Sequence, residues 1–314
     1  MHSQRLFPAL LKLKNGKFWK MLNLSTLKEK GIRKFCIRTW SLWEKLGIHV
    51  SPNHFYWPIP DTTELTNYDF SQTFPTEGID FDDQAMLNLL SEIAKYREEY
   101  FKIYTCSGYE SNGDGAILYG MIRKYKPRRI IEIGSGFSTK VSGRALQQNQ
   151  SENFTGEIVS IEPYPSAVLL NVVNQSDHIT LIQEKVEKVG NLILESLSAG
   201  DVLFIDSSHV VKCGNDVHFI YLNLLPKIPV GTIVHIHDIR FPYEYPREWV
   251  IKAKKFWNEQ YLLQMFLSFN DSFKIVFAGN YMYNKYPKIM RESLVGLGDE
   301  ENGWPGCFWI TRVK

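Results

Sequence analysis

From about residue 112 onward, short apolar runs rich in β-branched residues alternate with longer segments of helical periodicity. A chain connects such strands in parallel through right-handed helical crossovers. The alternation therefore predicts an α/β fold built on a doubly wound, mostly parallel sheet, closed by an antiparallel pair. The expected strands are 129–133, 157–161, 179–183, 202–205, 232–236, 273–277 and 307–311. The expected helices are 115–125, 138–148, 166–173, 186–197, 216–225 and 248–258.

The sequence before residue 112 follows a different, mostly helical pattern interrupted by prolines. Its expected helices are 31–47 and 80–104, the second beginning at Asp82 or Asp83. The change of pattern predicts two regions. These are a helical N-terminal region over 1–111 and a sheet domain over 112–314.

The charge of the chain is divided unevenly. Residues 1–40 hold ten basic residues and one acidic residue, a net +9, which leaves −7 for the rest of a chain of total charge +2. An acidic body argues against binding of nucleic acid, whereas the basic head leaves open contact with a membrane surface, another protein or a second copy of the chain.

The expected location is the cytoplasm, with peripheral membrane contact left open. The longest apolar runs are strand-sized, far short of the ~20 residues of a membrane helix, and lysines interrupt any secretory signal. The four cysteines stand far apart without a CxxC pair, which predicts free thiols in a reducing compartment.

Parallel sheets of this type bind ligands at the carboxyl ends of their strands. The first strand is followed by Gly134 and Gly136, which allow a tight turn and a close approach of the backbone to a ligand. A dinucleotide-binding fingerprint would place Gly or Ala where Thr139 stands. Together with Glu132 before the glycines, this departure favours a nucleoside that carries an amino group and disfavours a nicotinamide oxidoreductase.

Acidic and imidazole side chains follow three further strands. Glu162, after the second strand, is suited to bind both hydroxyls of a ribose, although a helix cap or an exposed charge is the alternative. Asp206 and His209 follow the fourth strand, and His237 with Asp238 follows the fifth. An imidazole near its ordinary pKa of ~6.5 is suited to remove a hydroxyl proton, which makes His209 a candidate catalytic base.

Two further features of the sequence lie in or just after the fifth strand. His235 lies deeper in the strand than His237 and is expected to pack in the interior. The segment 241–246 is rich in aromatic residues and prolines, and it either overhangs the acceptor or packs in the core.

Three motifs in this order resemble the class I S-adenosylmethionine-dependent methyltransferases: EIGSGFST over 132–139, IEPYP over 161–165 and GDVLFIDSSH over 200–209. The resemblance spans roughly 112–314 and implies a seven-stranded Rossmann-like sheet in the order 3-2-1-4-5-7-6. It implies S-adenosylmethionine as the cofactor, with Glu162 on the ribose and residues 184–186 beside the adenine. The other implied cofactor-binding residues are Glu132, Gly134, Gly136, Ser138 and Asp206.

The sequence is also similar to metal-assisted O-methyltransferases of sugars and catechols. By that likeness Asp206, His237 and Asp238 would hold a divalent ion, while His209 and Asp238 would be catalytic. Because His237 stands where an acidic ligand would be, the preference shifts from Mg²⁺ toward Mn²⁺, Fe²⁺ or Zn²⁺, or to a polar pocket without metal.

The expected function is therefore O-methylation of a hydroxyl on a sugar, glycan or small natural product, with metal assistance left open. The alternatives are a cofactor-binding member repurposed for another metal-dependent reaction or for a non-catalytic role, and a less favoured NAD(P)-dependent oxidoreductase.

Overall fold

The computed structural model describes residues 29–103, 113–294 and 305–314. By its internal contacts the chain divides into two compact units, Met1–Tyr68 and Asp69–Lys314. The boundary expected at residues 111–112, most of the basic segment 1–40 and Cys106 lie outside the described residues. The described cysteines, Cys36, Cys213 and Cys307, are free thiols. Within the described ranges, no helix has the length and apolar character needed to cross a membrane.

The first unit contains helix α3 (Glu29–Lys45), close to the expected range. The helix ends just before Gly47, whose φ of +73° is accessible to glycine because it has no Cβ. A short 3₁₀ helix, η3 (Glu64–Asn67), follows near the end of the unit.

The second unit begins with a helical segment that packs on the sheet. Helix α4 (Asp83–Ile93) starts where the side chain of Asp82 accepts a hydrogen bond of 2.9 Å from the amide of Ala85, as an N-cap does. The apolar face of α4 is buried against α6 (Gly113–Tyr125) and the sheet edge at β6. The segment continues through η4 (Ala94–Tyr96) and α5 (Arg97–Ile103), so the helix expected over 80–104 is present in three pieces.

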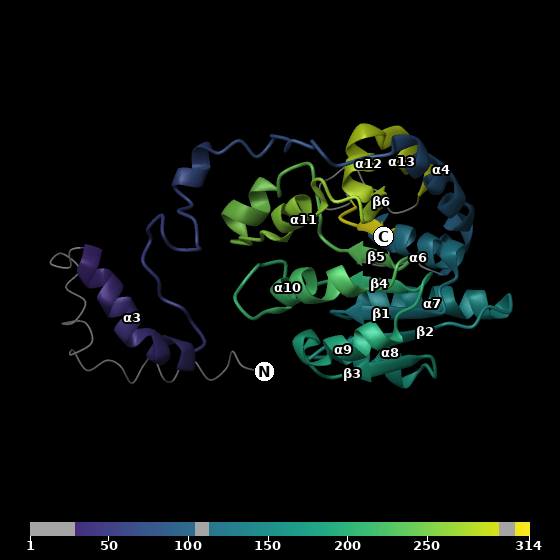
Figure 1. The fold of residues 1–314 in the computed structure, drawn as a ribbon, viewed down its shortest axis with the longest axis horizontal. Coiled ribbons are helices and arrows are strands. Elements are labelled where there is room, and N and C mark those ends of the chain that lie inside the picture. The colour runs from purple at the N-terminus through teal and green to yellow at the C-terminus, as the bar shows by residue number, and fades with distance from the viewer. Residues whose placement is uncertain (1–28, 104–112, 295–304) are drawn as a thin grey trace. The chain divides into compact units, whose positions relative to one another are not determined.

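The sheet has seven strands in the order β3-β2-β1-β4-β5-β7-β6, which confirms the predicted order (Figure 1). Strands β1 to β5 are parallel, whereas β7 runs antiparallel between β5 and β6. Their bounds are β1 Arg129–Ile133, β2 Glu157–Ile161, β3 Ile179–Ile182, β4 Val202–Ile205, β5 Ile233–Ile236, β6 Phe273–Ala278 and β7 Phe308–Arg312. The four central strands from β2 to β5 bring Glu162, Gly134, Asp206 and His237 to one edge.

The helices form two sets, as a doubly wound sheet requires: α6, α7 and α8 contact one another in turn, and α9 contacts α10 and η6. The remaining bounds are α7 Phe137–Ser151, α8 Ala167–Asn174, α9 Val186–Ser196, α10 Asp216–Phe219, η6 Ile220–Leu224, η7 Leu225–Lys227, η8 Glu248–Lys252, α11 Glu259–Leu267, α12 Gly279–Lys285 and α13 Pro287–Ser293.

The helix expected over 248–258 is wrong beyond Lys252. A short π-helical turn, η8, ends there, and Lys254 adopts a left-handed φ of +57° that no right-handed helix continues through. A new helix, α11, then begins at Glu259.

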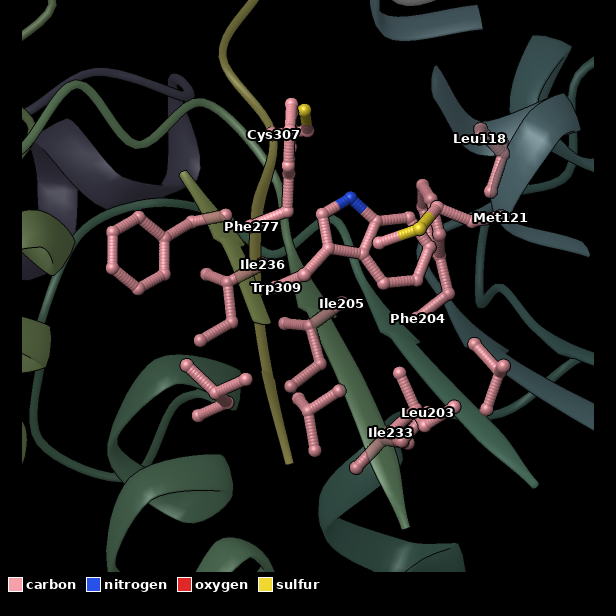
Figure 2. Packing of buried hydrophobic residues seen from close by; sticks show 14 of the residues in the cluster. Leu118, Met121, Leu203, Phe204, Ile205, Ile233, Ile236, Phe277, Cys307 and Trp309 are labelled. Carbon is pink, nitrogen blue, oxygen red and sulfur yellow. The ribbon is translucent and has the colours of Figure 1, made fainter. Parts of the chain in front are cut away.

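The core covers both faces of the sheet, and one part of it lies between α6 and the central strands. Phe204 of β4 and Trp309 of β7 are buried, and Figure 2 shows Met121 of α6 reaching toward Trp309. His235 of β5 stacks on Phe204 with ring centroids 4.2 Å apart and is itself buried. The prediction that His235 packs in the interior is confirmed.

Candidate functional site

The glycine turn after β1 touches the end of β4. Gly134 has a φ of +76°, and a Cβ placed on it would lie 2.0 Å from the backbone carbonyl oxygen of Asp206. The Gly134 amide donates to the carbonyl of Ile161 over 3.0 Å, and the Asp206 amide donates to the carbonyl of Ile133 over 2.8 Å. Only glycine fits this position, because both the backbone conformation and the space exclude a side chain.

Glu132 is buried under this turn. The hydroxyls of Ser138 and Thr139 each donate to one of its carboxylate oxygens over 2.5 Å. Thr139 Oγ1 also accepts from the amide of Gly136 over 3.1 Å. The residue that departs from the dinucleotide fingerprint therefore ties the glycine turn to the strand below it. Glu132 and Ser138, both predicted to bind the cofactor, meet each other at this point.

Burial raises the pKa of Glu132 to about 7, against the hydrogen bonds from Ser138 and Thr139. Because the folded protein holds this proton more tightly than the unfolded chain, the stabilising contribution is full below pH 4.5 and is lost as the pH rises through 7. We expect this loss to be roughly 3 kcal/mol. Urea denaturation of the wild type and of Glu132→Gln across this window measures it. Parallel curves for the two proteins would contradict the assignment.

A pocket of about 410 Å³ opens beside the turn, at the carboxyl ends of β1, β2 and β4. Gly134, Glu162 and Asp206 line it. One carboxylate oxygen of Glu162 accepts from the Tyr164 amide over 2.7 Å, and the other faces the Ser135 amide at 3.5 Å. The carboxylate is thus held at the pocket wall, where it can accept further hydrogen bonds.

The far side of the pocket comes from the loop after β3. Lys185 and Val186, which the resemblance places beside the adenine, line the pocket. Glu184, expected beside them, is not among the lining residues and instead pairs with Lys188 over 2.9 Å.

His209 lies at the centre of a cluster of three carboxylates. Its Nε2 is 3.3 Å from Asp206 Oδ1 and 3.5 Å from Asp238 Oδ2, while its Nδ1 is 3.0 Å from Glu259 Oε2. The ring is buried and packs on Trp257 with centroids 4.4 Å apart. The structure thus brings together the predicted residues Asp206, His209 and Asp238.

The carboxylates hold His209 in its charged form. Burial alone would lower its pKa, but the hydrogen bonds and charges of Asp206 and Glu259 outweigh burial and raise the pKa to about 10. The same contact, despite burial, lowers the pKa of Asp206. The ring is therefore protonated at neutral pH, and it has to lose this proton before it can serve as the predicted base.

His237 and Asp238 follow β5 next to this cluster. His237 Nδ1 lies 3.4 Å from His235 Nε2, and its Nε2 lies 4.0 Å from Asp238 Oδ1. Asp238 has a φ of +55°, in the left-handed region that non-glycine residues rarely adopt. Such conformations persist where the surroundings fix them, and they concentrate at functional sites.

The predicted metal ligands do not converge on one point. In the ranges that the structure describes, no group of three His, Cys, Asp or Glu side chains is arranged to hold a metal ion. Asp206 and Asp238 are instead joined through His209 Nε2. Because the ring lies between the two carboxylates, they do not face one shared metal position, and the donors in this arrangement do not fit an ion.

The segment that forms this edge of the sheet matches a known protein family. Residues 131–239 match a protein family described as a methyltransferase domain. They run from β1 through β5 and include the glycine turn, Glu162, Asp206 and His209. The strand order, with β7 antiparallel between β5 and β6, is the order that the resemblance implies. Residues 131–239 thus match a methyltransferase domain, and the sheet has the strand order implied by the resemblance to class I S-adenosylmethionine-dependent methyltransferases.

Proteins similar to this chain occur among curated proteins and solved structures. An uncharacterized protein of Archaeoglobus fulgidus is 29% identical over 188 residues, which cover 55% of this chain and 84% of that protein. The S-adenosylhomocysteine-bound methyltransferase PaMTH1 of Podospora anserina is 16% identical, with a TM-score of 0.41, over 84% of this chain and all of its own. An O-methyltransferase of Bacillus cereus in complex with S-adenosylhomocysteine is 14% identical, with a TM-score of 0.38, over 72% of this chain and 90% of its own.

The aromatic segment after β5 contributes mainly to the interior of the second unit. Phe241 and Tyr245 are buried, while Tyr243 is half-buried. The Pro242 carbonyl accepts from the amide of Phe74 over 2.7 Å. Of the two alternatives for this segment, core packing describes its buried rings.

Two buried acids at this edge of the sheet do not stand out in the sequence. Asp114, in the first turn of α6, accepts from the amides of Gly306 and Cys307, both over 2.9 Å. Gly306 in turn abuts Asp238, because a Cβ on it would lie 3.2 Å from the Asp238 Cα. Glu259 is the second such acid. An acid in the first turn of a helix is common, so position alone marks neither as part of a site.

Proposed function

We propose that the protein transfers the methyl group of S-adenosylmethionine to a hydroxyl of a small molecule or glycan. The observation that carries the proposal is that a pocket and a buried cluster of charged residues meet at one edge of the sheet. A nucleoside-sized pocket lined by Gly134 and Glu162 shares the residue Asp206 with the buried cluster around His209.

The pocket side supports the choice of cofactor. Glu162 offers a carboxylate to ribose hydroxyls, and Lys185 with Val186 offers a wall for the adenine. The turn at Gly134 leaves its backbone open to the methionine part, because no side chain stands between them.

The cluster of charged residues around His209 supports methyl transfer to an oxygen atom. The acceptor oxygen attacks the methyl carbon as the carbon–sulfur bond breaks, and the hydroxyl proton passes to a protein carboxylate. Asp238 is the proposed proton acceptor, since His209 is already protonated at neutral pH. The His209 cation lowers the pKa of a neighbouring hydroxyl, and the site aligns the reactants. No step is assigned to a metal ion, because the donors do not fit one.

Glu162→Ala tests the cofactor site. Loss of a charge-assisted contact to the ribose should weaken S-adenosylhomocysteine binding by about 10- to 100-fold, which corresponds to roughly 1.5–3 kcal/mol. Isothermal calorimetry on the folded variant measures the change. Glu184→Ala is the matched control, since Glu184 follows the neighbouring strand but is not among the pocket-lining residues. No binding to the wild type would refute the proposed function, and equal affinities for wild type and Glu162→Ala would refute the site.

A further inference from the structure

The loop that carries His209 is bound by the start of a helix about fifty residues later in the chain. The carbonyl of His209 accepts from the amides of Asn258 and Glu259 over 3.0 and 3.2 Å. The side chain of Asn258 accepts from the amide of Val211 over 2.6 Å. These bonds hold His209 at a φ of +58°, a left-handed conformation.

The same helix start contributes a carboxylate to the His209 ring. Glu259 is fully buried, and its Oε2 accepts from the Ser207 hydroxyl over 2.6 Å and lies 3.0 Å from His209 Nδ1. A buried carboxylate is unfavourable unless charged or polar partners compensate it. His209 is the cationic partner that Glu259 has in these contacts.

The contact at Nδ1 determines where the opposite nitrogen points. With Nδ1 bonded to Glu259 and one ring face packed on Trp257, Nε2 is directed to Asp206 and Asp238. A carboxylate that bonds one imidazole nitrogen in this way fixes the orientation and proton position of the ring, as in hydrolase triads.

We propose that Glu259 is a positioning residue that fixes the His209 ring with Nε2 between Asp206 and Asp238. The proposal rests on the proposed function for the reaction that the ring serves. Glu259 acts through His209, because its own carboxylate is buried and does not line the pocket.

The test observes the ring directly in the full-length protein labelled with ¹⁵N-histidine. Long-range proton–nitrogen spectra report which ring nitrogens carry protons, and comparison with His209→Gln assigns the signal. The wild type should show a protonated Nδ1 on His209 whose proton exchanges slowly with water. Glu259→Gln should lose this slow exchange, because a neutral amide replaces the carboxylate.

Glu244→Gln is the matched control. Glu244 is also a buried acid near α11, but its carboxylate bonds Tyr261 and the amide of Tyr245 rather than His209. This variant should retain the wild-type signal of His209. A slowly exchanging Nδ1 proton that survives in Glu259→Gln would overturn the proposal. Should Glu259→Gln not fold, the wild-type spectrum still decides, because an unprotonated Nδ1 on His209 contradicts the contact.

Calorimetry with S-adenosylhomocysteine separates this proposal from the proposed function. Wild type and Glu259→Gln should both bind it, since Glu259 lies outside the pocket and reaches it through one hydrogen bond, from the lining residue Ser207. If the wild type does not bind, the proposed function fails while the spectra still report on Glu259. If both proteins bind and their spectra agree, only the positioning role fails.

Discussion

Replacing Gly134 by alanine should destabilise the domain by roughly 3 kcal/mol or more and abolish S-adenosylhomocysteine binding. The left-handed φ penalises any side chain, and the new Cβ would lie 2.0 Å from the Asp206 carbonyl oxygen. Relief requires β1 and β4 to separate, which breaks the bond from the Asp206 amide to Ile133. Urea denaturation and calorimetry measure the two effects.

Gly136→Ala is the control for this prediction. Gly136 has an extended φ of 177°, and a Cβ on it would meet no atom within 4 Å. Its stability should therefore remain near that of the wild type. A Gly134→Ala protein as stable as Gly136→Ala would show that the contact with Asp206 does not constrain the turn.

The second large effect is a loss of stability at alkaline pH that depends on His209. Because Asp206 and Glu259 raise its pKa from 6.5 to about 10 against the effect of burial, the folded state holds the ring proton more tightly than the unfolded chain. The resulting stabilisation is complete below pH 6.5 and disappears as the pH rises through 10. It amounts to about 5 kcal/mol.

Denaturation curves of the wild type and of His209→Gln at pH 6.5 and at pH 9.5 measure this contribution. The wild type should lose several kcal/mol more than the variant between the two conditions, because the variant has no proton to release at this position. Equal losses would mean that the carboxylates around His209 do not hold it charged.

The sequence predicts the sheet well because the strands are short β-branched runs separated by clear helical segments. Gly134, Glu162 and Asp206 each follow a parallel strand, and parallel strands present their carboxyl ends at the same edge of the sheet. The sequence therefore also predicts that these three residues lie together, as they do in the pocket wall. The break at Lys254 was not predictable in this way, because no glycine or proline marks it and only its left-handed φ ends the π-helical turn.

The pKa of His209 and the contacts that determine it could also not be predicted from the sequence. An isolated histidine has a pKa that suits a base, and only the three-dimensional approach of Asp206 and Glu259 raises the pKa of His209 above that range. Glu259 is separated from His209 by a long stretch of chain, and its place at the start of α11 is typical of ordinary helix capping. Its role becomes visible only when α11 meets the loop after β4.

The bonds between α11 and the His209 loop join two parts of the chain that lie far apart in the sequence. The family match ends at residue 239, before Glu259, so the matched segment contains the glycine turn, Glu162 and His209 but not the carboxylate that orients the ring. A substitution at position 259 changes the partner of His209 Nδ1 and of the Ser207 hydroxyl, while the residues of the matched segment stay the same. Within one fold, the residues that line the pocket and the carboxylate that orients the imidazole thus lie in different stretches of sequence.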